Sequence, residues 1–342
     1  MFDEARLCGG LFSAAFPSGG SSPHPSVMRK LAVVHHRHAE WVPTIAEAEP
    51  RLLVRGWHPK DDPGALTDPW IADAEGLFVW RVPTGLVERM PKLTWIQNAG
   101  AGVDHLLADP SIPPRIAITR ADGQFGLWMS RYVAAHLLAE TQRIDECRRA
   151  QHDRTWDSHL LPEDLTGRTA LIFGFGRIGR RIGRALRELG MEVHGFVRSV
   201  REDPEFPLHG PASLHEFLPS ARVLVLCAPL TAETRGFVDA KLLANGHAGL
   251  TLINVARGEQ VVAKDLLAAL ETGKLGRAVL DVFPSEPLPA DSPLWSHPRI
   301  VVTPHHSGPS RPRTMIPNIL PNLRRFAEGK PVEGAVDRAR GY

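Results

Sequence analysis

Residues 169–183, TALIFGFGRIGRRIG, decide how the rest of this chain is interpreted. A short apolar run, 170–173, is typical of a buried strand and leads into Gly174, Gly176 and Gly179, after which a helical pattern begins. G-x-G-x-x-G between a strand and a helix is the fingerprint of a dinucleotide site. The first glycine permits a tight turn, the second lets a pyrophosphate approach the backbone, and the third lets the helix pack closely.

The helix that follows this turn would present its first free N–H groups to the cofactor. We expect those of Arg177 and Ile178 to face the phosphates, because the N-terminus of a helix carries partial positive charge. In a chain with 30 glycines the motif alone would also fit an ordinary strand-to-helix turn. Its position between an apolar strand and a helix favours the dinucleotide site.

The composition favours a two-domain globular protein. The chain has 342 residues, which exceeds the usual size of one domain, and it is 43% apolar and 23% charged. Lys and Arg number 40 against 38 Asp and Glu, so no nucleic-acid-binding footprint is indicated. We expect the arginines on the helix after the glycines to form its solvated face.

Three cysteines, Cys8, Cys147 and Cys227, lie far apart and fit neither a zinc spacing nor a disulfide framework. This indicates a reducing compartment, the cytoplasm, and no metal site. No apolar run is long enough to predict a membrane span. We expect residues 1–27 to be a disordered extension, although a true start at Met28 would account for them equally well.

Strand-like and helical segments alternate after Met28, which predicts parallel sheets of the α/β class. A smaller, discontinuous, flavodoxin-like substrate domain is expected from residues 28–125 and 304–342. Its strand candidates are residues 31–35, 52–55, 77–81, 93–97 and 116–119.

The second domain is predicted over residues 126–303 as a Rossmann-type, doubly wound parallel sheet. Six strands are expected, namely the one before the glycines and residues 192–197, 222–226, 250–254, 277–281 and 300–302, with helices at 239–244 and 263–272.

Two further helical segments would link or complete the domains. Residues 127–149 contain no Pro or Gly and predict one long interdomain helix. Residues 311–329 also have a helical pattern but include three prolines, so we expect a bent or broken helix there.

The end of the second strand of the nucleotide domain indicates which cofactor is held. NAD enzymes place an acidic residue there, roughly twenty residues beyond the glycines, to bind the ribose 2′-hydroxyl. This chain instead has Arg198 and Ser199, and no carboxylate appears before Glu202. An arginine can pair with a 2′-phosphate and a serine can donate to it, so NADP(H) is predicted. NAD(H) remains the alternative if Arg198 is only a solvated loop charge.

Polar side chains follow three neighbouring strands of this domain. Arg257 follows the fourth strand, Asp281 and Glu286 follow the fifth, and His305 and His306 follow the sixth. The carboxyl ends of parallel strands share one edge, so these residues can face the nicotinamide crevice. Taken singly, each could be an ordinary loop residue. Together, an arginine for a substrate carboxylate, a histidine as proton donor and a carboxylate that orients it suit reduction of a 2-keto acid.

The segments VARGEQV, LDVFPSEPLP and TPHH, in this order after GFGRIG, resemble those of the D-isomer-specific 2-hydroxyacid dehydrogenases. The resemblance runs from about Met28 to the C-terminus. It implies that Arg257 binds and polarises the substrate, that Glu286 is the partner of the histidine, and that His305 is the acid/base.

The same resemblance implies further site residues. Ala101 and Gly102, in NAGAGVDHL, match the loop whose backbone N–H groups hold the substrate carboxylate. Asp281 would contact the nicotinamide side of the cofactor, and Thr234 would lie near it. A homodimer formed through the long helix is also implied.

Within this family the chain is most similar to NADPH-preferring reductases that convert glyoxylate to glycolate and hydroxypyruvate to D-glycerate. A reductase of bulkier 2-keto acids and a non-catalytic NAD(P)-sensing protein remain the alternatives. Two positions depart from the family pattern. Arg131 stands where a glutamate is usual, and His306, expected to shape the substrate pocket, follows the catalytic histidine. Trp80 is expected to be a packing residue.

Overall fold

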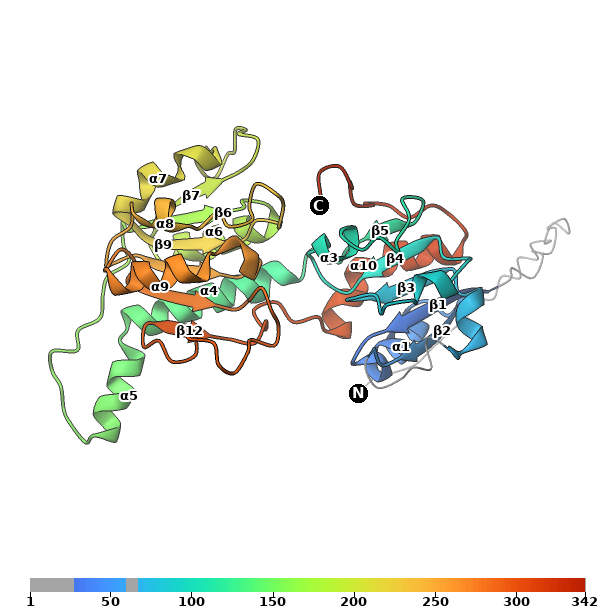
Figure 1. The fold of residues 1–342 in the computed structure, drawn as a ribbon, viewed down its shortest axis with the longest axis horizontal. Helices are drawn as coiled ribbons and strands as arrows, with labels where there is room; N and C mark the ends of the chain where they lie inside the picture. The colour runs from blue at the N-terminus through green and yellow to red at the C-terminus, as the bar shows by residue number, and fades with distance from the viewer. Residues whose placement is uncertain (1–27, 60–66, 342) are drawn as a thin grey trace, which may run out of the picture.

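The computed structural model describes residues 28–59 and 67–341, which form two lobes, each built on a parallel sheet (Figure 1). The strand order is β2-β1-β3-β4-β5 in one sheet and β12-β11-β10-β9-β6-β7-β8 in the other. The first is the flavodoxin-like order. The second is the dinucleotide-binding order with β12 added beyond β11, so the predicted α/β class is confirmed. The extension expected over residues 1–27 lies outside the described residues.

The first sheet contains the five strands predicted from the sequence, with ends that differ by one or two residues. They are β1 (Arg29–Val34), β2 (Leu52–Trp57), β3 (Gly76–Val79), β4 (Trp95–Asn98) and β5 (Ala117–Thr119). The helical elements of this lobe are α1 (His38–Ala48), η1 (Pro69–Asp73), η2 (Val87–Arg89), α3 (Asp104–Leu107) and α10 (Pro312–Ala327). Helix α10 packs against α1, so the last part of the chain returns to the lobe in which it began (Figure 1).

The second sheet has seven strands, one more than predicted. They are β6 (Thr169–Phe173), β7 (Glu192–Phe196), β8 (Leu208–His209), β9 (Ala221–Leu226), β10 (Thr251–Asn254), β11 (Arg277–Leu280) and β12 (Ile300–Val302). The helical elements here are α4 (Phe125–Thr141), α5 (Ile144–His152), α6 (Arg177–Glu188), η3 (Pro211–Ser213), α7 (Leu214–Phe217), η4 (Leu218–Ser220), α8 (Ala240–Leu243), η5 (Gly258–Gln260) and α9 (Ala263–Glu271). The additional strand, β8, has only two residues, too few for a periodic pattern to reveal it.

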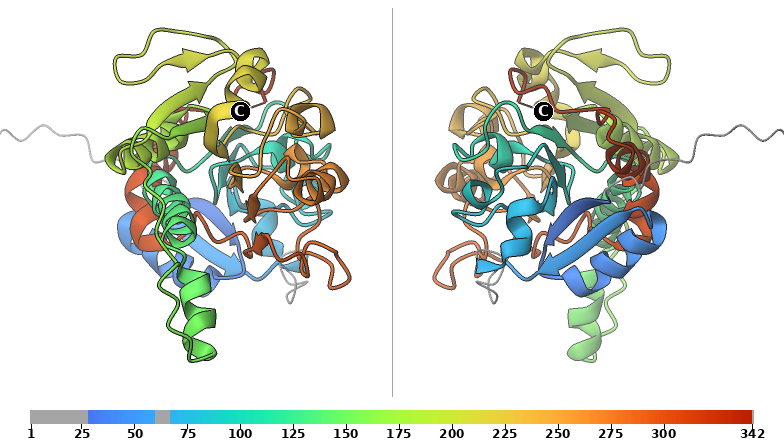
Figure 2. Two further views of the ribbon diagram at one scale, coloured as in Figure 1. Left: turned by 90° about the vertical axis from the view of Figure 1, so that its left-hand side faces the viewer. Right: turned by 90° about the vertical axis from the view of Figure 1, so that its right-hand side faces the viewer.

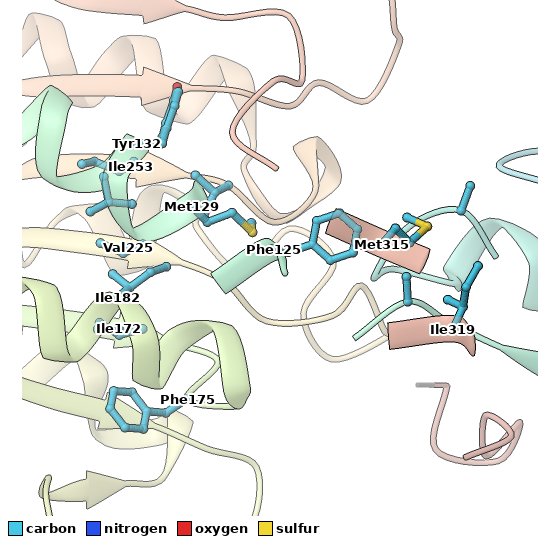
Figure 3. Packing of buried hydrophobic residues seen from close by; sticks show 14 of the residues in the cluster. Phe125, Met129, Tyr132, Ile172, Phe175, Ile182, Val225, Ile253, Met315 and Ile319 are labelled. Carbon is cyan, nitrogen blue, oxygen red and sulfur yellow. The ribbon is translucent and has the colours of Figure 1, made fainter. Parts of the chain in front are cut away.

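One hydrophobic cluster extends through both lobes. Helix α4 packs along α6 on the face of the second sheet, and its first residue, Phe125, is buried. Figure 3 shows Phe125 between Met129 of the same helix and Met315 of α10. The two lobes are therefore joined by packed apolar side chains as well as by the chain itself.

One long interdomain helix was predicted over residues 127–149, and this prediction is wrong because the helix is interrupted. Helix α4 ends at Thr141, and Arg143 adopts a left-handed conformation with φ of 56° before α5 begins. This conformation cannot continue a right-handed helix. Helix α5 has no buried residue and projects from the body of the molecule (Figures 1 and 2).

A bent or broken helix was expected over residues 311–329, and the broken alternative is wrong. Helix α10 is continuous although Pro317 and Pro321 lie inside it. Both prolines are exposed, whereas Met315, Ile319 and Leu323 are buried against the first sheet. The burial of this apolar face offsets the backbone hydrogen bonds that the two prolines remove.

The arginines after the glycine turn are not simply a solvated face. Arg180 donates to Asp203 at 2.9 Å, and Arg184 donates to Glu205 at 2.7 Å. The hydrogen bond from Arg180 lowers the pKa of Asp203 to about 2, which keeps its carboxylate charged. These pairs tie the segment that follows β7 to helix α6.

Arg222, at the start of β9, is a buried residue on which several elements depend. It donates to Glu163 at 2.8 Å, to Thr251 at 2.8 Å and to Glu140 at 3.0 Å. It therefore holds helix α4 and the segment before β6 against two strands.

We predict that Arg222→Ala lowers the free energy of unfolding by about 3 kcal/mol, because it leaves partly buried carboxylates without their cation. Urea denaturation of the full chain measures this change. As a control, Lys92→Ala breaks an exposed ion pair with Asp73 and should leave the midpoint nearly unchanged. Equal midpoints for both variants would contradict the prediction.

Candidate active site

A cavity of about 1120 Å³ lies between the lobes, at the carboxyl ends of both sheets. Except for Asp281, all the site residues predicted from the sequence line it. They are Ala101, Gly102, Gly174, Gly176, Arg177, Ile178, Gly179, Arg198, Ser199, Thr234, Arg257, Glu286 and His305. The fold therefore brings to one place residues that are up to about two hundred positions apart in the sequence.

Each glycine of the turn after β6 has its own structural reason. Gly174 has φ of 99°, and a Cβ there would lie 2.3 Å from the backbone nitrogen of Ala228. A Cβ on Gly179 would lie 2.4 Å from the carbonyl oxygen of Gly174, so helix α6 can pack this closely only without a side chain. A Cβ on Gly176 would meet nothing within 4 Å, which leaves the backbone open to the cavity.

This open turn fits the pyrophosphate of a dinucleotide. Gly176 is the N-cap of α6, no side chain caps the helix, and Arg177 and Ile178 are its first residues. Their N–H groups have no carbonyl partner within the helix, because the first four donors of any helix lack one. The positive end of α6 is thus available to an anion in the cavity.

Arg198 and Ser199 line the cavity just after strand β7. In the strand order, β7 lies on the other side of β6 from the strands that precede the catalytic candidates. Within residues 28–59 and 67–341, Arg198 forms no salt bridge, so its guanidinium is available to a ligand. A hydrogen bond from Thr231, the backbone and the charge of Arg198 lower the pKa of Glu233 on the facing loop. Thr234 lies in this loop too, but its hydroxyl donates to the carbonyl of Pro229 at 2.8 Å.

His305 and Glu286 form a hydrogen-bonded pair. Nδ1 of His305 lies 2.8 Å from Oε2 of Glu286, whose other oxygen accepts the N–H of Phe283 at 3.0 Å. Burial raises the pKa of Glu286, but the hydrogen bonds from His305 and Phe283 outweigh it and the net pKa is lowered. A charged carboxylate on Nδ1 leaves Nε2 of the ring to exchange a proton with a ligand in the cavity.

Asp281 lies below the histidine loop and does not line the cavity. It is fully buried, and its carboxylate accepts the N–H groups of His306 at 3.0 Å and Ser307 at 2.9 Å and the hydroxyl of Thr303 at 2.6 Å. Its backbone carbonyl accepts the N–H of His305 at 2.8 Å. These four bonds hold His305 in a left-handed conformation with φ of 51°. Asp281 therefore supports this loop from its buried side. It does not line the cavity, where a direct nicotinamide contact was expected.

Arg257 reaches from the end of β10 to the other lobe. Its Nε donates to Oδ1 of Asp104 at 2.9 Å, and its Nη1 donates to the carbonyl of Ala256 at 2.8 Å. A Cβ on Gly102 would lie 1.6 Å from Nη2 of Arg257, so the guanidinium rests directly on the predicted substrate loop. The amide of Asn98 shapes this loop by donating to the carbonyl of Gly102 at 2.8 Å.

Sequence reasoning missed two residues of the site. Asp104 belongs to the quoted segment NAGAGVDHL, but no pattern showed that it would meet Arg257. Trp80 was expected to be a packing residue, yet it lines the cavity, and its ring lies edge-on to that of His305 with centroids 6.0 Å apart. A Cβ on Gly100 would lie 2.0 Å from this ring. The available signal was that Trp80 follows a strand of a parallel sheet, as the other site residues do.

The two departures from the family pattern lie beside helix α4. His306 lines the cavity, and its ring is edge-on to Tyr132 with centroids 5.6 Å apart. Tyr132 bonds to Thr303 at 2.7 Å and so joins the network around Asp281. The guanidinium of Arg131 lies 6.0 Å from the ring of Trp128, outside the cavity lining.

The described part of the chain contains neither a candidate metal cluster nor a candidate membrane-spanning helix. No group of three or more His, Cys, Asp or Glu residues there could hold a metal ion. No helix in the same residues has the length and apolar character needed to cross a membrane.

Comparisons with known proteins agree with this geometry. The family model described as D-isomer specific 2-hydroxyacid dehydrogenase, NAD binding domain, matches residues 134–307. Glyoxylate/hydroxypyruvate reductase A of Citrobacter koseri is 36% identical over 315 residues, which cover 89% of this chain and 96% of that protein.

Two solved structures are similar over nearly the whole chain. A D-isomer specific 2-hydroxyacid dehydrogenase from Xanthobacter autotrophicus Py2, in complex with NADPH and MES, has a TM-score of 0.81 and 33% identity and covers 92% of this chain and 100% of its own. An NADPH-dependent glyoxylate/hydroxypyruvate reductase from Sinorhizobium meliloti, in complex with NADP and sulfate, has a TM-score of 0.80 and 30% identity, with coverage of 92% and 100%. The chain therefore belongs to the D-isomer-specific 2-hydroxyacid dehydrogenases, a family of oxidoreductases that use a nicotinamide cofactor.

Proposed function

We propose that this protein uses NADPH to reduce small 2-keto acids, converting glyoxylate to glycolate and hydroxypyruvate to D-glycerate. The observation that carries the proposal is the convergence of Arg257 and the His305–Glu286 pair on the cavity that also contains the glycine turn. The names of the relatives from Citrobacter koseri and Sinorhizobium meliloti support the substrate class.

The substrate would lie between the two lobes. Residues 28–125 and 304–342 would form the substrate domain, and residues 126–303 the cofactor domain. The backbone N–H groups of Ala101 and Gly102 would hold the carboxylate, and Arg257 would bind it and polarise the keto group. Closing the lobes over the substrate would exclude water from the reacting atoms.

The chemistry needs a hydride at the keto carbon and a proton at the keto oxygen. When bound, the reduced nicotinamide supplies the hydride. His305 supplies the proton from Nε2, and the Glu286 carboxylate on Nδ1 stabilises the protonated ring before the transfer and keeps it oriented. The 2-keto acid thereby becomes a 2-hydroxy acid, and His305 takes up a proton again before the next turnover.

The cofactor preference is proposed from the opposite end of the cavity. Arg198 would pair with the 2′-phosphate of NADPH, and Ser199 would donate to it. Support comes from the available guanidinium and from the absence of a carboxylate at residues 197–201. Asp281 would act on the nicotinamide side only through the loop that it supports, and Thr234 would shape the facing loop. NAD(H) would then bind more weakly than NADP(H).

A small substrate is favoured by Trp80. Its ring lies against Gly100 and His305 and occupies space at the reacting end of the cavity. A reductase of bulkier 2-keto acids would have to accommodate the larger group elsewhere. A purely cofactor-sensing protein would have no need for the complete set of Arg257, Glu286 and His305.

We also propose that the protein is a homodimer. Helix α5 projects from the body and has no buried residue, and in the segment after it the side chains of Trp156 and Leu161 are 95% and 71% exposed. Apolar side chains exposed this far are typical of a surface that another chain covers.

The first test of the function is a substrate panel with the wild type and His305→Ala. The wild type should reduce glyoxylate and hydroxypyruvate with a higher kcat/KM than phenylpyruvate. His305→Ala should lower kcat about 10²- to 10⁴-fold, because the proton donor is lost, and should leave the Kd for NADPH nearly unchanged. Wild-type turnover in this variant would remove His305 from the mechanism. A wild type inactive on the whole panel that still binds NADPH would favour the sensing protein.

The cofactor proposal is tested by Arg198→Ala. The Kd for NADPH should rise about tenfold, because a charge-assisted hydrogen bond to the 2′-phosphate is lost, while the Kd for NADH changes little. Arg313→Ala, an exposed arginine outside the cavity lining, is the matched control. Equal losses for both cofactors would mean that the 2′-phosphate is held elsewhere.

The dimer is tested by the molar mass in solution. The wild type should have the mass of two chains, and Trp156→Glu should shift the equilibrium toward the monomer, because a charge would be placed in an apolar interface. Light scattering on a sizing column measures both. A wild type with the mass of one chain would refute the proposal.

A further inference from the structure

A second carboxylate, that of Asp104, lies at the cationic end of the cavity. Asp104 is the first residue of α3 and follows the substrate loop that contains Ala101 and Gly102. Its Oδ1 accepts the Nε–H of Arg257 at 2.9 Å and also lies 2.9 Å from Nη2. The side chains of Arg257 and Asp104 are only 18% and 22% exposed, so the pair is largely shielded from solvent. The reaction as described above gives this carboxylate no role.

The atoms involved show which edge of the guanidinium is occupied. A guanidinium has five N–H donors in a plane and can offer paired donors along the Nε/Nη2 edge or along the Nη1/Nη2 edge. Asp104 lies against the first edge, and the carbonyl of Ala256 takes one donor of Nη1. Nη2 is buried and makes no hydrogen bond of good geometry with any described residue. Donors of the second edge are therefore still available.

The available edge lies next to the substrate loop. Nη2 is so close to Gly102 that a Cβ there would lie 1.6 Å from it. A buried donor without a partner costs free energy unless a ligand satisfies it. An anionic ligand held by the N–H groups of this loop would lie within reach of the donor.

We propose that Asp104 is a positioning residue, which holds Arg257 by its Nε/Nη2 edge so that the Nη1/Nη2 edge is presented to the carboxylate and keto oxygen of the substrate. The proposal rests on the substrate-binding role proposed for Arg257. The Asp104–Arg257 pair would also help to hold the two lobes together over the site. Arg257 follows β10 of one sheet and Asp104 follows β4 of the other, so the pair forms only when the lobes are together.

The charges around Arg257 would also allow Asp104 to weaken substrate binding, so the two roles predict opposite results. Glu286 also feels the charge of Arg257, so two carboxylates compete for one cation with any incoming anion. If Asp104 were mainly a competitor, its removal would strengthen substrate binding. If it positions the guanidinium, its removal weakens substrate binding, because Arg257 becomes free to adopt other rotamers.

The test uses Asp104→Asn, which keeps the size of the side chain, and Asp104→Ala in the full chain with NADPH. We expect the KM for glyoxylate and the inhibition constant of oxalate, a non-reducible dicarboxylate, to rise about tenfold in Asp104→Ala and less in Asp104→Asn. The Kd for NADPH should stay near the wild-type value, and the melting temperature shows whether each variant is folded at the assay temperature. Asp68→Asn is the matched control, because it breaks an Asp–Arg pair of 3.0 Å with Arg55 outside the cavity.

Arg257→Lys separates the failure of this proposal from that of the proposed function. Lysine has no second edge to present, so adding Asp104→Asn to Arg257→Lys should raise the KM much less than it does in the wild type. If Arg257→Lys leaves the KM and the oxalate constant unchanged, the substrate role of Arg257 is wrong. If Arg257→Lys raises them but both Asp104 variants leave them unchanged or lower them, only the positioning role is overturned. Full additivity in the double variant would overturn it as well.

Discussion

Parallel strands end at one edge of their sheet, and the site depends on this constraint in both lobes. In the second sheet it brings together the glycine turn after β6, Arg257 after β10 and His305 after β12. In the first sheet it places Trp80 after β3 and the substrate loop after β4. Packed side chains around Phe125 join the two lobes (Figure 3). The two sheet edges then line one cavity. Under the proposed function, a dinucleotide would lie along one edge, and a small substrate between the edges would meet groups from both.

The electrostatics of the cavity suit anionic ligands. Among the described residues, seven arginines and four acidic residues line it: Arg37, Arg120, Arg177, Arg198, Arg201, Arg257 and Arg340, and Asp104, Asp122, Glu233 and Glu286. The net positive charge would favour the phosphorylated cofactor and the carboxylate substrate of the proposed function. Within this field, the Glu286 carboxylate contacts His305 and the Asp104 carboxylate contacts Arg257. In the proposed reaction, carboxylates so placed would orient the groups that bind and protonate the substrate, at the cost of some attraction for anions.

A buried network supports the loop that contains His305. The Asp281 carboxylate is inaccessible to solvent and is satisfied by donors from Thr303, His306 and Ser307, and Tyr132 of α4 extends the network. An ionised carboxylate can be buried in this way only when several donors surround it. The left-handed backbone of His305 is therefore maintained by the cofactor lobe, while Trp80 of the other lobe contacts its ring.

The sequence alone was enough to predict the α/β class, the strands other than β8 with a residue or two of error, the glycine turn and the polar strand ends. Local periodicity and strand-to-helix motifs carry this information, because they depend on neighbours in the chain. Where packing competes with local preference, prediction failed. The exposed faces of Pro317 and Pro321 allow α10 to remain continuous, and Arg143 interrupts a segment that contains no Pro or Gly.

Contacts between distant segments were decided only by the tertiary structure. Asp281 is a buried support and not a cavity residue, Trp80 faces His305, and Asp104 meets Arg257 from the opposite lobe. No spacing in the sequence records which side chains of two separate sheets will lie within 3 Å of each other. That proximity follows from how the lobes pack. The sequence therefore determined which chemical groups reach the edge of each sheet, and the packing of the lobes determined which of them touch.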